Sequence, residues 1–366
     1  MKFKKMALVA TAGIGVCAAS LVACGGGGSD SNAVDNVRMT WFGITNWHYQ
    51  IGKVGILLDG ETISDFSSAS PLPTVPSVVK AFNTIKLRGN IDVILVGHEH
   101  GDHGVQVPEW AKQTGKQVYA PPAVCATVVK YGVPASQCTS LKGGETIKLS
   151  DAVTVRVVRW VHSVSGCTGF GNGVAGPETF GFLISTVTNA RPTQPLQLFV
   201  SDSGMGGKDL TTPLVANGIK YGSPMENLTA AMAAAGATSL DLWQGGPESR
   251  VVTQARMVVP AFNVKTFMPH HLGVRANSVS EFKLEYGLHF PYDTNEQPLL
   301  RDFLAASKVP QVVPVNYWDA WTFSSTGVTT AESTNQKAIY GIPASGPGPG
   351  KQGENPRAGQ LECVGD

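Results

Sequence analysis

The feature that most constrains this chain is a buried strand that runs straight into a cluster of coordinating side chains. Residues 91–97 read IDVILVG, an apolar run typical of a buried strand, and residues 98–103 read HEHGDH. The chain has eight histidines in 366 residues, and three of them fall in this hexapeptide. So many polar groups at the end of a buried strand need partners, because burying them unpartnered costs free energy. A solvated surface loop is the alternative to a binding site.

The chemistry of this motif favours a metal site. Zinc and similar borderline metals prefer imidazole nitrogen and carboxylate oxygen as ligands. An extended or tightly looped segment places His98 and His100 on the same side, so both can bind one ion. Asp102 and His103 can then face a second ion close by.

Further candidate ligands follow other apolar runs. His162 comes directly after VTVRVVRWV, Asp202 closes LQLFVSD, and His270 and His271 follow VKTFMP. A single histidine or aspartate in such a place is more often a core or capping group. Because the pattern recurs at four predicted strand ends, we expect these side chains to converge on one edge of the sheets.

Strands and helices are mixed along the chain. Apolar runs predict strands at 54–60, 91–97, 116–120, 153–161 and 196–202. Helical patterns occupy 75–85, 107–115, 122–131, 227–237 and 249–262. The length allows two domains or one large α/β or sandwich domain. This mixture predicts an α/β fold with helices packed outside sheets.

The N-terminus is typical of an export signal. Residues 1–23 begin with lysines, continue with an apolar run and end in small residues, which indicates a signal peptide. LVAC at 21–24 resembles a bacterial lipobox, in which Cys24 becomes the lipid-modified first residue; an ordinary signal peptide is the alternative. Gly25 resembles the residue found there in lipoproteins sent to the outer membrane. We therefore expect a lipid-anchored protein of the cell envelope that faces the periplasm.

The remaining chain divides by composition. The Gly/Ser-rich residues 24–36 predict a flexible tether, 37–342 the folded domain, and 343–366 a Gly/Pro-rich tail. The formal charge is +1 and no block of like charge is present, so nucleic acid is not an expected partner.

Four further cysteines lie in the exported part, besides Cys24. An even number in an oxidising compartment favours disulfides. Cys125 and Cys138 flank one predicted helix and turn, which leaves Cys167 and Cys363 as the other pair. Free structural thiols are the alternative.

Together these motifs resemble the metallo-β-lactamase-fold hydrolase superfamily. The resemblance covers residues 38–320 and depends on HEHGDH followed in order by His162, Asp202 and a late histidine. Shorter matches, WFGIT, ILLDG and P-x-H, resemble the branch that contains ascorbate-phosphate lactonase and N-acyl-phosphatidylethanolamine phospholipase. The resemblance implies a four-layer αββα sandwich with metals at one rim.

The resemblance also implies a role for each candidate residue. One metal would be held by His98, His100 and His162, the second by Asp102, His103 and His271, and Asp202 would bridge both. His271 is preferred to His270 because it matches the Pro-x-His pattern of the family. Asp59 corresponds to an aspartate that supports the ligands. His48 and His289 match no ligand position.

The implied activity is hydrolysis with two divalent metal ions, zinc first and manganese or iron as alternatives. A water shared by two metals becomes a hydroxide nucleophile near neutral pH. Such a site would cleave an ester, lactone, amide, thioester or phosphodiester of a small-molecule substrate, with Asp102 and Asp202 as catalytic residues. The alternatives are a non-catalytic binding or assembly lipoprotein that keeps the fold, and a mononuclear iron enzyme resembling a persulfide dioxygenase.

Overall fold

The structure is a computed structural model, and it describes most of the chain from Val34 onward. The described residues are 34–62, 75–162, 178–203, 207–216, 219–246, 251–271, 276–278, 283–284 and 296–344. The chain divides into two compact units, Met1–Ser31 and Asn32–Asp366, and all described residues belong to the second. The predicted signal peptide, Cys24, Cys167, His289 and Cys363 lie outside the described residues.

An eight-stranded sheet forms one inner layer of this unit. Its strand order is β18-β17-β1-β2-β3-β4-β5-β6. The strands are β1 (Val37–Trp41), β2 (Trp47–Ile51), β3 (Val54–Leu58), β4 (Val93–Leu95), β5 (Gln117–Ala120), β6 (Cys138–Ser140), β17 (Ala320–Ser324) and β18 (Gly327–Ala331). The neighbours from β3 to β6 are parallel, so the carboxyl ends of these strands meet at one edge.

A six-stranded sheet forms the other inner layer, in the order β14-β13-β10-β9-β8-β7. Its strands are β7 (Thr146–Lys148), β8 (Val153–Arg159), β9 (Phe180–Thr188), β10 (Arg191–Ser203), β13 (Leu242–Gly246) and β14 (Phe267–Pro269). Because β9 is antiparallel to both β8 and β10, and β10 is parallel to β13 and β13 to β14, the strands β8, β10, β13 and β14 share one direction. Two short ribbons, β11 (Val215–Ala216) with β12 (Ile219–Lys220) and β15 (Ala276–Ser278) with β16 (Lys283–Leu284), stand apart from both sheets.

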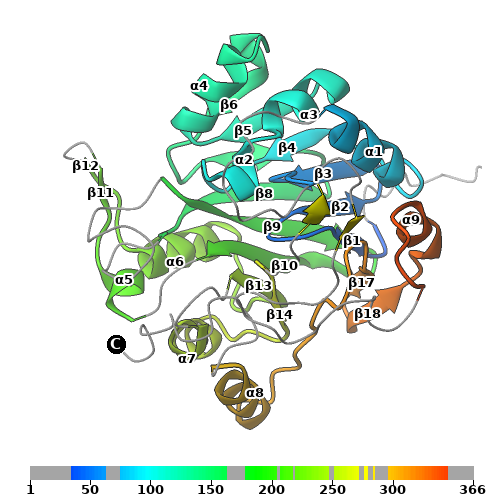
Figure 1. Cartoon of the computed structure of the whole chain (residues 1–366). Helices are drawn as coiled ribbons and strands as arrows, with labels where there is room; N and C mark the ends of the chain where they lie inside the picture. Colours follow the sequence, from blue (N-terminus) through cyan, green and yellow to red (C-terminus); the bar gives the residue numbers. More distant parts are fainter. Residues whose placement is uncertain are drawn as a thin grey trace, which may run out of the picture. The chain divides into compact units, whose positions relative to one another are not determined.

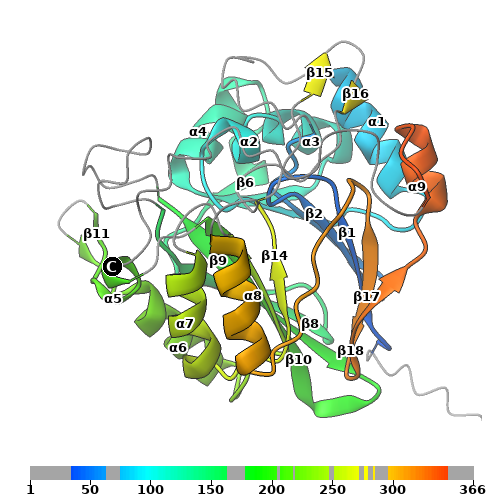
Figure 2. The same ribbon diagram turned by 60° about the horizontal axis from the view of Figure 1, so that its bottom comes forward.

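Helices cover the outer faces (Figures 1 and 2). On the eight-stranded sheet lie α1 (Val75–Ile85), α3 (Val107–Thr114), α4 (Pro122–Lys130) and α9 (Thr334–Ile339). On the six-stranded sheet lie α6 (Pro224–Ala234), α7 (Val251–Ala261) and α8 (Glu296–Ala306). The short helices α2 (Gly101–Gly104) and α5 (Lys208–Thr211) and the 3-10 turn η1 (Ala135–Gln137) complete the described elements.

The inner faces of the two sheets contact each other directly. The Tyr49 hydroxyl of β2 donates a hydrogen bond to Gln244 Oε1 of β13 at 2.5 Å, and both side chains are fully buried. The Gln244 amide also contacts the sulfur atoms of Met39 of β1 and Met268 of β14, and the ring of Trp47 lies 6.1 Å from that of Tyr49. The predicted α/β fold with a four-layer αββα sandwich is therefore confirmed.

Candidate metal centre

The ligand-bearing segments leave strands of both sheets at one rim. His98 and His100 follow β4 of the eight-stranded sheet, while His162 follows β8 and His271 follows β14 of the six-stranded sheet. The two sheets are joined at this rim, because the Phe180 amide at the start of β9 donates to the carbonyl of Gly97 at 2.9 Å. Strands that run in the same direction within each sheet thus bring residues that are far apart in the sequence together at this rim.

Six of the seven predicted ligands form two groups. In each group one possible ligand atom per residue lies within 4.8 Å of those of the other two residues. The first group is His98, His100 and His162, and the second is Asp102, His103 and His271.

The first group is a cluster of three imidazoles. The ring centroid of His98 lies 4.6 Å from that of His100 and 4.6 Å from that of His162, and the last two are also 4.6 Å apart. His98 and His162 are buried, and His100 is partly exposed. The His98 ring also lies 3.9 Å from the His103 ring, so the two groups adjoin.

The second group combines two imidazoles with a carboxylate. His103 Nε2 lies 3.3 Å from His271 Nε2, and Asp102 Oδ2 lies 3.8 Å and 3.6 Å from these two nitrogens. Burial by itself raises the pKa of Asp102, but His103, His271, His98 and His100 together outweigh it and hold that pKa below its ordinary value. Asp102 is therefore ionised at neutral pH and can serve as an anionic ligand.

A hydrogen-bond network fixes the tautomer of His103. Thr45 donates its hydroxyl proton to Asp59 Oδ2, so its oxygen is left to accept from His103 Nδ1, 2.6 Å away. Asp59 Oδ2 lies 2.9 Å from the same nitrogen, and Asp59 Oδ1 accepts from the Gly97 amide at 2.8 Å. The proton of His103 therefore sits on Nδ1, and Nε2 directs a lone pair into the second group.

This donor chemistry fits divalent metal ions. Five imidazoles and one carboxylate meet at a largely buried rim, and an acceptor nitrogen of His103 is held ready by its hydrogen-bond partners. These are the ligand types that zinc and its neighbours prefer. Asp202 lies in β10, directly after Ser201, but its side chain is outside what the structure describes.

The two adjacent histidines have different surroundings. His271 belongs to the second group, whereas the ring of His270 contacts Trp47 Nε1 and the carbonyl of Ser201. His48, which matches no ligand position of the family, is buried beside the carbonyl of Asn90.

The sequence reasoning did not find Thr45 or Trp47. Neither residue belongs to the histidine motif, and each reaches it only through the fold. Thr45 is 58 positions from His103, and Trp47 is 223 positions from His270. The one local signal is the sequence WFGIT, which ends in Thr45. It resembles the family sequence, but the resemblance assigns it no role.

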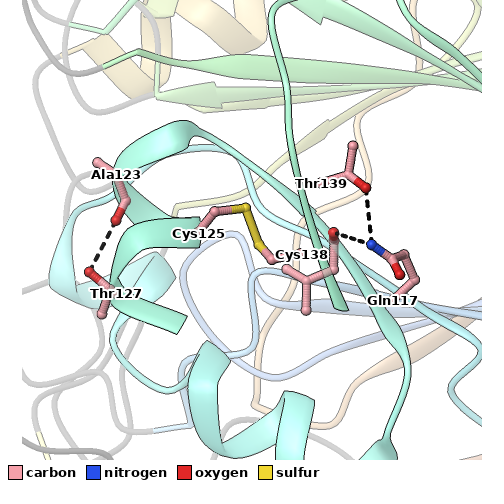
Figure 3. Close-up of a disulfide and its surroundings, with 7 residues drawn as sticks. Gln117, Ala123, Cys125, Thr127, Cys138 and Thr139 are labelled. Atoms are coloured by element: carbon pink, nitrogen blue, oxygen red, sulfur yellow. Dashed lines mark hydrogen bonds between the residues drawn. A yellow bond between two sulfur atoms is a disulfide. The ribbon is translucent and has the colours of Figure 1, made fainter. Parts of the chain in front are cut away.

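A disulfide joins helix α4 to the edge strand β6 of the eight-stranded sheet. Cys125 of α4 is bonded to Cys138 of β6, as Figure 3 shows. A Cβ placed on Gly104 of α2 would lie 3.5 Å from Cγ2 of Val124, so α4 packs against the helix that holds Asp102 and His103. The disulfide therefore links α4, which packs against α2, to β6 at the edge of the eight-stranded sheet.

Comparison with known proteins found relatives but no matching family model. The chain is 28% identical over 142 residues to a UPF0173 metal-dependent hydrolase of Pyrobaculum arsenaticum, which is 39% of this chain and 58% of that protein. It is 33% identical over 133 residues to a UPF0173 metal-dependent hydrolase of Thermodesulfovibrio yellowstonii, 34% of this chain and 45% of that protein. The chain thus spans about half the length of the curated relatives that it matches.

Solved structures with a similar chain arrangement are also known. Igni18, a metallo hydrolase from Ignicoccus hospitalis, has a TM-score of 0.49 at 15% identity, over 79% of this chain and 98% of its own. The metallo-beta-lactamase fold protein YhfI from Bacillus subtilis has a TM-score of 0.46 at 11% identity, over 79% of this chain and 99% of its own. Within the described part of the chain, no helix is long and apolar enough to cross a membrane.

Proposed function

We propose that this protein is a dinuclear metal-dependent hydrolase that cleaves an ester, lactone, amide, thioester or phosphodiester bond of a small molecule. The observation that supports this most directly is the pair of adjoining three-residue groups at one rim. A mononuclear enzyme needs only one such group. The relatives' description as metal-dependent hydrolases supports the same reaction class.

Each group would hold one ion. His98, His100 and His162 supply three neutral nitrogens, and Asp102, His103 and His271 supply two nitrogens and a carboxylate. We assign Asp202 as the ligand shared by both ions, because it lies at the end of β10 at the same rim. Zinc is the first choice of metal, with manganese or iron as alternatives.

Bound metals would lower the pKa of a coordinated water toward neutrality and polarise the bond under attack. The protein's own groups prepare the site for that chemistry. Asp59 and Thr45 hold the His103 ring in one tautomer. Asp102, kept ionised by the histidines around it, can accept a proton from an incoming group and pass it to the leaving group.

We further propose that the protein is a lipoprotein anchored through Cys24 in the outer membrane, with the catalytic unit in the periplasm. The lipobox-like LVAC and the Gly/Ser-rich stretch after it support this location. The Cys125–Cys138 disulfide supports it as well, because such bonds persist in oxidising compartments.

The decisive test is metal content together with turnover. We expect the full chain to bind about two metal ions, measured by elemental analysis, and to hydrolyse members of a panel of lactones, thioesters and phosphodiesters. His162→Ala should lose metal, whereas His48→Gln, a change at a buried histidine outside both groups, should keep it. Asp202→Ala should lose more activity than the roughly 10- to 100-fold typical of changes beside a metal site, with an unchanged thermal midpoint.

Two results would contradict the proposal. Fewer than one bound metal per chain with no turnover would favour a binding or assembly protein that keeps the fold. Full activity with a single ion would favour a mononuclear enzyme.

A further inference from the structure

His270 is a buried histidine whose two ring nitrogens are both engaged by protein groups. The indole Nε1 of Trp47 donates to His270 Nδ1 at 3.2 Å. His270 Nε2 lies 2.5 Å from the carbonyl oxygen of Ser201, which can only accept, so Nε2 donates. His270 is fully buried, so both of these contacts are shielded from solvent.

These two bonds indicate the tautomer of the ring. Nδ1 must offer a lone pair to Trp47, and Nε2 must carry the proton that it gives to Ser201. A second proton on Nδ1 would break the bond from Trp47 and place a charge in a fully buried position. In these two bonds Nδ1 accepts and Nε2 donates, which is the pattern of the tautomer that carries its proton on Nε2.

The three residues connect the two sheets at the rim. Trp47 belongs to β2 of the eight-stranded sheet, and Ser201 belongs to β10 of the six-stranded sheet. The backbone amide of His270 donates to Gly245 of β13 at 3.1 Å. Ser201 is held from its other side as well, because Trp243 Nε1 donates to its hydroxyl at 2.9 Å.

The carbonyl that His270 binds belongs to the peptide group between Ser201 and Asp202. A peptide group is planar, so the Ser201 carbonyl oxygen and the Asp202 Cα belong to one rigid unit, and holding the oxygen restrains the Cα. His270 is in turn joined by a peptide bond to His271, a member of the second group. The His270 imidazole thereby restrains the backbone of Asp202 relative to that of His271.

We propose that His270 is a positioning residue for the metal centre, acting through the Ser201 carbonyl to restrain the backbone of Asp202 relative to that of His271. This inference depends on the proposed function, in which Asp202 bridges two ions. It assigns the first histidine of the PHH sequence a task distinct from that of the predicted ligand His271, and it makes Trp47 part of the same hydrogen-bonded unit.

Two substitutions at His270 test the hydrogen bonds separately from the packing. His270→Gln supplies an N–H for the Ser201 carbonyl and an oxygen for the Trp47 indole, whereas His270→Leu fills similar space with neither. We expect His270→Leu to weaken binding of one of two zinc ions about 10- to 100-fold, measured by chelator competition. His270→Gln should restore the affinity to within a few fold of the wild type.

Trp243→Phe is the matched control for a purely structural effect. It removes a buried hydrogen bond to the same serine but leaves the peptide carbonyl untouched, so zinc affinity should stay unchanged even if the thermal midpoint falls. Trp47→Phe removes only the hydrogen bond to His270 Nδ1 and should also weaken zinc binding, as His270→Leu does. It therefore replaces His270→Leu in the test if His270→Leu does not fold.

The outcomes are separable from those of the proposed function. A wild type that binds no zinc refutes the metal centre itself. A wild type that binds two ions while Trp47→Phe and His270→Leu bind both with unchanged affinity overturns the positioning role. Equal losses in His270→Gln and His270→Leu overturn it too, because the restored hydrogen bonds would then be irrelevant.

Discussion

His48 makes the stability of the fold depend on pH in a predictable way. It lies in β2, is 2% exposed, and its Nε2 is 2.7 Å from the carbonyl of Asn90. Burial disfavours the charged ring and lowers the pKa of His48 to about 4, with Arg38 acting in the same direction and the Asn90 carbonyl and Asp92 opposing it. In the unfolded chain the same ring has a pKa of about 6.5.

The sign and size of the effect follow from proton linkage. Between pH 6.5 and pH 4 the unfolded chain binds a proton at His48 that the folded protein excludes, so acid favours unfolding. The contribution is complete above pH 6.5 and declines by about 1.4 kcal/mol for each pH unit below it. By pH 4 the free energy of unfolding should have fallen by about 3 kcal/mol through this residue alone.

Comparison with His48→Gln isolates this contribution. Glutamine can still donate to the Asn90 carbonyl, but it does not titrate, and all other groups are common to both proteins. We expect urea denaturation with a chelator present to give a constant difference in unfolding free energy above pH 7. The wild type should then lose about 3 kcal/mol relative to the variant as the pH falls to 4. Parallel curves for the two proteins over this range would refute the assignment of a buried neutral imidazole.

Two further predictions concern stability. The Cys125–Cys138 disulfide joins residues 13 positions apart. Replacing both cysteines by serine should therefore lower the free energy of unfolding, measured in urea, by about 3 kcal/mol. A urea midpoint unchanged by this double substitution or by dithiothreitol would show that the bond does not constrain the chain. Gly55→Ala should cost about 3 kcal/mol or prevent folding, because the new Cβ would lie 1.7 Å from the Asn90 carbonyl oxygen. Gly101→Ala, with open space around its Cβ, is the control that should leave the urea midpoint near that of the wild type.

Local patterns were sufficient for most elements of the fold. The helix predicted at 75–85 is α1 with the same bounds, and the apolar run at 91–97 contains β4. The strand predicted at 196–202 is longer in the structure, because β10 begins at Arg191. Its first residues, RPTQP, are polar and contain two prolines, so hydrophobic periodicity gives no signal there.

The candidate site was predictable to the extent that its residues mark strand ends. His98 and His162 each follow an apolar run, and the topology brings these ends together at one rim. The roles of Thr45, Trp47 and His270 could not be predicted in this way. They arise from contacts between the two sheets, and which side chains face each other across a sandwich depends on the register and twist of both.

Backbone strain at the rim indicates that the fold itself prepares this geometry. Six described residues other than glycine have positive φ, and three of them, Ile44, Asp59 and His271, are linked to the candidate centre. Asp59 contacts His103, and the amide of His271 donates to the carbonyl of Ile44 at 2.9 Å. Such conformations cost about 1–3 kcal/mol each and persist only where the surrounding contacts stabilise them. They are least common in β-branched residues such as Ile44.

That cost has a structural consequence for the ligands. With φ of 60°, the backbone at His271 turns sharply after β14, so that its ring enters the second group while the ring of the preceding His270 lies against Trp47 and Ser201. The left-handed turn, held by the hydrogen bond to the Ile44 carbonyl, therefore accompanies the entry of the His271 ring into the second group, while His270 keeps its contacts with Trp47 and Ser201.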